Sequence, residues 1–216
     1  MADELIKIEE SVTVEEGNSR FEMIAGIIIA VFTAILAING LAGDSYNQSI
    51  LLDNTEKVNA YDWYNTKGVK QALAEGQADT MAGLLESGAI AESKKADFQK
   101  ELDKLSANAQ RYIKEKNEIL KGSANIPPTD WIQDVNGELG KVIGAQEWEQ
   151  EIEKLDKAGA KTDIADLFLQ ICLVMGAVSL VMQKPRYKLM FLGLAGVLGI
   201  IGTIFCIIGV ITYWPF

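Results

Sequence analysis

Histidine is absent from this chain of 216 residues, which contains only two cysteines and four prolines. The lack of histidine removes the commonest general base and the commonest metal ligand. Cys172 and Cys206 both lie in apolar stretches, which argues against a thiolate zinc site or a disulfide framework. No P-loop, dinucleotide glycine pattern, G-x-S-x-G or H-E-x-x-H motif occurs. We therefore expect a protein that is not an enzyme and has no catalytic, cofactor-binding or metal-binding residues.

Charge is nearly absent from three long apolar runs, at residues 23–43, 164–182 and 189–214. About twenty apolar residues suffice for a helix to cross the roughly 30 Å hydrocarbon core of a bilayer. The one acidic residue in these runs, Asp166, lies within a turn of the start of the second. Uncharged runs of this length are rare in soluble helical bundles. The sequence therefore predicts an all-α membrane protein with three transmembrane helices.

The short connection between the second and third spans, residues 183–188, is basic. It carries Lys184, Arg186 and Lys188, and short loops of this kind stay in the cytoplasm under the positive-inside rule. Three spans then place the acidic N-terminal tail, residues 1–22, in the cytoplasm as well. The long segment 44–163 and the C-terminus are expected on the other side. The lysines just before the second span, Lys154, Lys157 and Lys161, argue against this orientation.

Each span carries small residues at alternating steps of four and three, which places them on one helix face. Such faces let helix backbones approach closely in lipid, and we expect three packing seams in a bundle or homo-oligomer. They are Gly26, Ala30, Thr33, Ala37 and Gly40; Cys172, Gly176 and Ser179; and Ala195, Gly199, Gly202, Cys206 and Gly209. No charged residue lies near the middle of any span, which argues against a proton-coupled transporter but leaves a passive pore possible.

Residues 44–163 have the composition of a helical arm, rich in Ala, Glu, Lys, Gln and Leu. An apolar frame suggests a coiled-coil seam, and its members are Phe98, Leu102, Leu105, Ala109, Tyr112 and Ile119. A second frame stays in register from Trp148 to Gly176, which predicts one continuous helix from about Glu138 to Met182. We expect a long helix-loop-helix arm rooted in two spans, with 89–121 packing along it.

Two breaks interrupt the arm. Ser87-Gly88 is expected to end a helix, and residues 122–130 form a loop because Gly122 opens it and Pro127-Pro128 cannot continue a helix.

An aromatic patch on the arm consists of Tyr61, Trp63 and Tyr64 with Lys67 nearby. It is a possible site for a partner, a sugar or lipid headgroups, but packing at the root of the arm is the favoured interpretation, because aromatic side chains bury large areas. The net charge of −10 and the lack of a basic stripe argue against nucleic acid as a partner.

The order of these features resembles one known family. An apolar span is followed by the cluster Asn59, Trp63, Tyr64 and Lys67; a charged helical arm then leads to the acidic start of a second span at 162–170, TDIADLFLQ. A short basic turn and a glycine-rich third span complete the pattern. From about Arg20 onward the chain resembles the bacterial membrane proteins known as domain of unknown function 4337. The resemblance implies a bacterial inner-membrane protein, and it implies no activity. With the orientation expected from the positive-inside rule, the arm and the C-terminus would lie in the periplasm.

The expected function is that of a non-enzymatic inner-membrane scaffold or accessory subunit. Such a protein would contact membrane lipid and self-associate, or join a larger membrane complex, through its seams and its arm. The alternative is a passive channel formed by an oligomer. A channel would place a polar or small face, such as that of Thr33 or Ser179, around an open axis, whereas a scaffold would close that axis with side chains or lipid.

Overall fold

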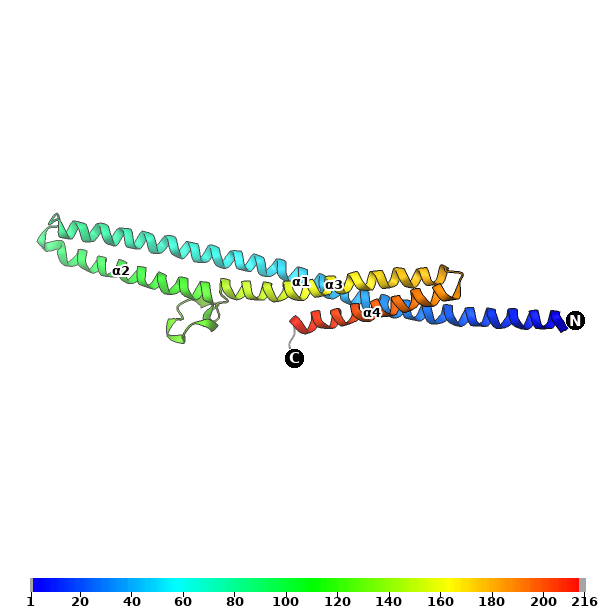
Figure 1. Cartoon of the computed structure of the whole chain (residues 1–216). Helices are drawn as coiled ribbons and strands as arrows, with labels where there is room; N and C mark the ends of the chain where they lie inside the picture. Colours follow the sequence, from blue (N-terminus) through cyan, green and yellow to red (C-terminus); the bar gives the residue numbers. More distant parts are fainter. Residues whose placement is uncertain (1, 214–216) are drawn as a thin grey trace. The chain divides into compact units, whose positions relative to one another are not determined.

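The computed structural model describes residues 2–213 and the side chains from residue 19 to residue 213. The all-α prediction is confirmed, and Figure 1 labels the four α-helices of the described chain. They are α1 (Ala2–Glu86), α2 (Glu92–Lys121), α3 (Ala145–Val181) and α4 (Pro185–Tyr213). Between α2 and α3 lie two short 3₁₀ helices, η1 (Ser123–Asn125) and η2 (Pro128–Asp130), and two short strands, β1 (Asp134–Val135) and β2 (Glu138–Leu139). Helices α1, α3 and α4 are long and apolar enough to cross a membrane.

The chain divides into two compact units. One unit, the span unit, contains the chain up to Ser49 and from Lys154 onward. The other, the arm unit, runs from Ile50 to Glu153. The predicted boundary of the arm at residue 44 is not a helix boundary, since α1 continues through it without a break.

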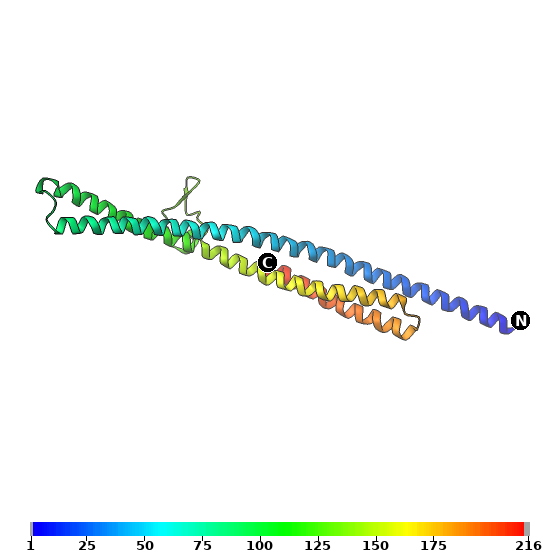
Figure 2. The ribbon, with the colours of Figure 1, turned by 90° about the horizontal axis from the view of Figure 1, so that it is seen from above.

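Within the span unit, α3 and α4 lie side by side, joined by the short turn before Pro185 (Figures 1 and 2). Phe168 of α3 and Phe205 of α4 stack with ring centroids 6.0 Å apart. Helix α1 packs against both, because Ile29 lies over Gly176 of α3 and Phe32 lies over Gly199 of α4. The core of this unit is therefore a three-helix contact in which glycines of two helices receive large side chains of the third.

Within the arm unit, α1 and α2 form an antiparallel pair (Figures 1 and 2). The predicted break at Ser87-Gly88 is confirmed: α1 ends at Glu86, and Gly88 has φ +71°. The apolar frame that begins at Phe98 faces inward, and its last member, Ile119, has no exposed surface. We expected residues 89–121 to pack along the arm, and α2 does pack along α1, where Lys67 pairs with Glu115 and Lys116 bonds Gln71. The C-terminal end of α2 also meets the first turn of α3, where Glu147 lies against Gly122.

Helix α3 begins later than the sequence predicts, at Ala145 rather than near Glu138. Residues 134–139 form an antiparallel hairpin in which Val135 pairs with Glu138. Asn136 and Gly137 both have positive φ, 57° and 87°, as a tight two-residue hairpin turn requires. The rest of the prediction is confirmed: no break interrupts α3 up to Val181, and every member of the frame from Trp148 to Gly176 is buried or half-buried.

Candidate functional site

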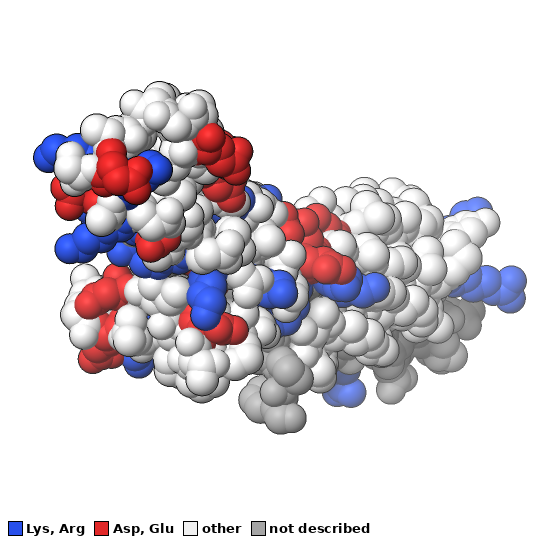
Figure 3. Space-filling view, turned by 90° about the vertical axis from the view of Figure 1, so that its left-hand side faces the viewer, with Lys and Arg blue, Asp and Glu red and all other residues white. Residues whose placement is uncertain are grey.

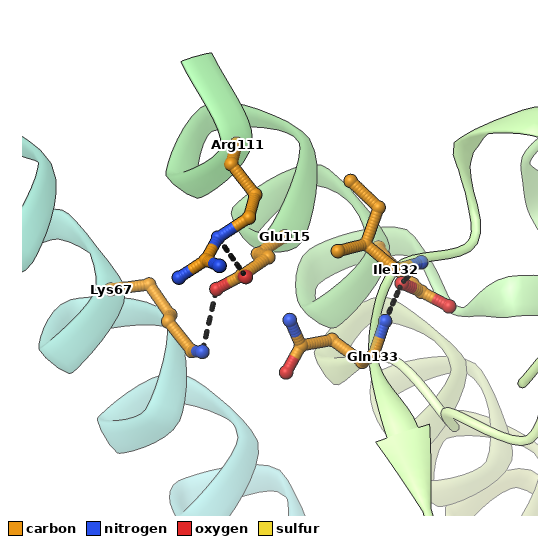
Figure 4. Close-up of polar contacts among 6 residues, drawn as sticks. Lys67, Arg111, Glu115, Ile132 and Gln133 are labelled. Carbon is orange, nitrogen blue, oxygen red and sulfur yellow. Dashed lines mark hydrogen bonds and ion pairs between the residues drawn. The ribbon is translucent and has the colours of Figure 1, made fainter. Parts of the chain in front are cut away.

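The most completely buried polar group of the arm unit is the carboxylate of Glu118, near the C-terminal end of α2. It has no exposed surface. Its Oε1 accepts a hydrogen bond from Ser123 Oγ at 2.8 Å. Its Oε2 accepts the backbone N–H groups of Ile132 and Gln133, each at 2.8 Å, and these two residues are labelled in Figure 4. Ser123 Oγ in turn accepts the backbone N–H of Val142 at 3.0 Å. This one carboxylate therefore bonds two parts of the segment that joins α2 to α3: Ser123 at its start, and the backbone of residues 132–133 further along.

A second buried carboxylate, Glu115, lies one turn earlier on α2 and faces α1. Lys67 of α1 pairs with Oε2 at 2.5 Å, and Arg111 pairs with Oε1 at 3.1 Å (Figure 4). The Arg111 guanidinium also lies 5.2 Å from the centre of the Tyr112 ring. Because only about 5% of the Glu115 side chain is exposed, these cations are its main compensation for lost hydration. The pairing fixes the register of α2 along α1.

Gly122 makes the close approach between the end of α2 and the start of α3 possible. Its φ is +86°, a value that side chains disfavour, and a Cβ there would overlap the Glu147 carboxylate. Glu147 uses both oxygens locally: Oε2 accepts the Gly144 N–H at 2.8 Å, and Oε1 accepts the Asn125 amide at 2.9 Å. The turn is thus held by the Glu147 carboxylate, which bonds the Asn125 side chain and the Gly144 backbone.

The structure spreads the aromatic patch of the sequence around α1 instead of gathering it on one face. The Tyr61 hydroxyl donates to Glu149 Oε1 at 3.0 Å, and this bond, followed by burial, raises the pKa of Tyr61. Tyr64 lies under the ammonium group of Lys116, 4.8 Å from its ring centre. Trp63 lines a separate cleft, and Lys67 belongs to the ion pair with Glu115. Three of the four residues therefore make contacts within the arm unit that account for their presence.

A buried asparagine makes a polar contact between two helices of the span unit. Asn39 of α1 has no exposed surface, and its Nδ2 donates to the Thr162 carbonyl oxygen at 2.8 Å and to Asp166 Oδ1 at 2.7 Å. Its Oδ1 receives no donor from the described residues. A buried amide that bonds two acceptors on α3 fixes the rotation and the axial position of α1 in this unit.

The second and third predicted seams face the interior of the span unit. Cys172, Ser179 and Ala195 are at most 2% exposed. A Cβ on Gly202 would lie 2.8 Å from Leu169 Cγ, and one on Gly209 would lie 3.1 Å from Thr162 Cγ2. Gly176 and Gly199 receive the side chains from α1, and Cys206 is half-buried. These residues pack within one chain.

The first predicted seam faces away from the rest of the chain. Gly26, Ala30, Thr33 and Ala37 are exposed, and a Cβ on Gly26 or on the half-buried Gly40 would meet nothing within 4 Å. Helix α1 uses a different face inside the unit, which includes Phe32 and Asn39. The small-residue face of α1 therefore remains uncovered in the single chain.

The contacts described above hold helices and connecting segments together. No group of three or more Cys, Asp and Glu side chains among the described residues is arranged to hold a metal ion. Acidic and basic side chains are mixed over the hairpin end of the arm unit, so no field of one sign covers that surface (Figure 3). Sequence reasoning missed Glu115, Glu118 and the role of Asn39. The available signals were acidic residues on the inward face of α2 and the one asparagine inside the first apolar run.

The fold and these contacts define a class: an all-helical protein with three helices of membrane-spanning length and a helical hairpin arm. The chain belongs to the family described as domain of unknown function DUF4337, which matches residues 21–212. The resemblance noted from the sequence is thereby confirmed. No curated protein and no solved structure matches the chain.

Proposed function

We propose that this protein is a multi-pass membrane scaffold that self-associates through the uncovered small-residue face of α1. Two of the three seams are filled by side chains of the same chain, whereas the seam from Gly26 to Gly40 is not. Small residues flanked by large aliphatic ones form the shallow groove through which helices associate in lipid. Ile38 and Leu41, 65% and 72% exposed, flank this groove and can contact either lipid or a second helix.

The occupant that fits this face best is α1 of a second copy, since two such faces are complementary to each other. A symmetric pair would bring the same small residues into contact from both sides. Close backbone approach supplies the packing energy, because lipid tails are as apolar as leucine and provide no hydrophobic drive between helices. Self-association of this kind is expected of a scaffold or of a subunit in a larger complex.

The mass of the purified full chain in detergent tests this proposal. Gly26→Leu and Gly40→Leu should lower the oligomeric state without disrupting the fold of the single chain, because a Cβ at these positions meets nothing within 4 Å in the chain. Gly193→Leu is the matched control, since Gly193 of α4 is also exposed with nothing within 4 Å. A monomeric wild-type protein, or an oligomer that all three variants leave intact, would overturn the proposal.

The orientation remains that of the positive-inside rule, with the turn at residues 183–188 in the cytoplasm and the arm on the periplasmic side of a bacterial inner membrane. Lys184 and Arg186 lie at this turn, which is too short to be carried across regardless of charge. A cysteine at Gln183 should react with a membrane-impermeant thiol reagent only after the cytoplasmic side is opened. Labelling of this cysteine in intact cells would show that the orientation is the opposite one.

The passive channel is the second candidate, and one of its two predicted pore-lining residues, Ser179, weighs against it. Ser179 has no exposed surface and donates to the Gly176 carbonyl oxygen, so it does not line an open axis within the chain. Thr33 lies on the exposed face of α1 and is compatible with either function. Ion flux through liposomes containing the purified oligomer separates the two functions: a scaffold gives none above that of empty liposomes.

A further inference from the structure

A small cleft lies in the arm unit between α1, the β-hairpin segment and the first turn of α3. Its volume is about 240 Å³, and two tryptophans, Trp63 and Trp148, line it. At roughly 30 Å³ for each water in the liquid, this volume corresponds to about eight waters, or a ligand of similar atom count. Glu56, Asn59 and Lys141 also line the cleft and supply one carboxylate, one amide and one ammonium group.

The residues that α1 contributes share one helix face because they follow each other at steps of three and four. Glu56, Asn59 and Trp63 have this spacing. The opposite wall is held by the network described above: Val142 is only 5% exposed, and its N–H bonds Ser123 Oγ, which in turn bonds the buried Glu118. The cleft is therefore preformed, with a wall whose position does not depend on a ligand.

The polar groups of the cleft are available to a ligand. Neither Trp63 nor Trp148 donates its indole N–H to another described residue, in contrast to Trp131, which bonds the Ser123 carbonyl oxygen. Glu56 and Asn59 are exposed. Lys141 pairs only loosely with Glu138, at 3.6 Å with both side chains more than 60% exposed, and exposed pairs of this kind exchange readily.

We infer that this cleft binds a small zwitterion that carries an ammonium group at one end and a phosphate or carboxylate at the other. A cation is attracted to the faces of tryptophan rings, and a neighbouring carboxylate such as Glu56 strengthens that attraction. The anionic end has Lys141 as a point charge and the Asn59 amide as a hydrogen-bond donor. One positive and one negative side chain at the same cleft are complementary to a ligand with both charges, and a singly charged ligand leaves one of them uncompensated.

Phosphoethanolamine is the probe for this chemistry, because it contains both groups within the size of the cleft. Titrated into the full chain in detergent, it should change tryptophan fluorescence saturably, with a dissociation constant of about 0.1 to 1 mM, as expected for so small a ligand. Glu56→Gln and Lys141→Gln should each weaken binding by about tenfold or more. Asp62→Asn and Lys70→Gln remove one charge each from exposed positions on α1 outside the cleft and should bind as the wild type does.

Two further experiments distinguish a lipid headgroup from a free zwitterion as the ligand, and test a neutral sugar as the alternative ligand class. Nanodiscs that contain phosphatidylethanolamine, compared with nanodiscs of phosphatidylglycerol alone, report whether a lipid headgroup competes with the soluble probe. Competition supports a headgroup as the source, and saturable binding without competition supports a free zwitterion. N-acetylglucosamine tests a neutral sugar. The inference is overturned if phosphoethanolamine gives no saturable change, if all four variants respond as the wild type does, or if the sugar binds in its place.

Discussion

Asn39 of α1 and Asp166 of α3 meet inside the span unit, with the amide Nδ2 2.7 Å from the carboxylate Oδ1. The same nitrogen donates to the Thr162 carbonyl oxygen at 2.8 Å. Asp166 is the acid that the sequence places within the first turn of the second apolar run, and Asn39 lies near the end of the first. The contact thus joins the end of the first apolar run to the start of the second.

Asn39→Ala should destabilise the span unit by about 1 to 3 kcal/mol, since interhelical hydrogen bonds in membrane proteins average roughly 0.6 kcal/mol and reach about 1.7 kcal/mol, and two are lost. Asn47→Ala is the control, because Asn47 is an exposed asparagine eight residues further along α1. Thermal unfolding of the two variants in the same detergent measures the difference. Equal melting temperatures would show that the Asn39 contact does not hold α1 in place.

The glycines of α4 predict opposite effects for the same substitution. Gly202→Ala places a Cβ 2.8 Å from Leu169 Cγ and 3.1 Å from the Ala165 carbonyl oxygen, and such overpacking costs about 1 to 3 kcal/mol. Gly193→Ala meets open space and should leave stability unchanged or raise it by up to about 1 kcal/mol. The unfolding free energies of the two variants, measured in the same detergent, test this difference. A harmless Gly202→Ala would mean that α4 does not approach α3 closely.

The buried Glu118 carboxylate should be indispensable for the segment between α2 and α3. Glu118→Ala leaves the N–H groups of Ile132 and Gln133 without their acceptor, and hydrogen bonds to a charged group contribute about 1.5 to 3 kcal/mol each. We expect a loss of at least about 3 kcal/mol and faster hydrogen exchange at these two amides. The control, Glu92→Ala, removes an acid that is 88% exposed and should cost less than about 1 kcal/mol. Unchanged exchange at both amides would contradict the assigned role.

How far the sequence predicts this structure depends on how far apart in the sequence the interacting residues are. The three apolar runs, the break at Ser87-Gly88 and the loop at Gly122 are local signals, and all three appear in the structure. The hairpin at 134–139 also had a local signal, Asn136-Gly137, but its two-residue strands are too short for an alternating pattern to show.

Long-range partners could not be predicted in the same way. Lys67 and Glu115 are forty-eight positions apart, and nothing in either local pattern selects the other among the many charged residues of the arm. The α1 seam shows the same limit: its spacing defines a helix face, but only the packing of Phe32 and Asn39 shows which face turns inward.

The pH dependence of the arm unit should contain a contribution from Asp53. Burial, followed by the nearby carboxylates of Glu151 and Glu56, raises the pKa of Asp53 above its usual value. The folded state then binds the proton more tightly than the unfolded state, so this contribution to stability is full below the unfolded pKa of about 4 and declines as the pH rises through the folded value. At pH 7 the ionised carboxylate opposes folding.

Asp53→Asn should therefore stabilise the protein at neutral pH, by less than about 1 kcal/mol because solvent screens the partly exposed carboxylates. The advantage of the variant over the wild type should shrink as the pH is lowered toward 4. Melting temperatures measured across this pH range test the sign, with Asp53→Glu as the control that keeps a titrating group. A variant that is less stable than the wild type at pH 7 would show that Asp53 makes a favourable contact when ionised.

The interior of α3 gives a last test, at Gly159. This glycine lies within the unbroken helix from Ala145 to Val181, and a Cβ on it would meet nothing within 4 Å. Alanine loses less backbone entropy on folding than glycine does, so Gly159→Ala should stabilise the protein by up to about 1 kcal/mol.

Leu155→Pro, one turn earlier and only 1% exposed in the wild type, should cost about 3 kcal/mol or more because it removes a helix hydrogen bond and clashes with the preceding turn. Helical content from circular dichroism and unfolding free energy check both variants. A destabilising Gly159→Ala together with a silent Leu155→Pro would mean that the helix is broken between the arm and the span.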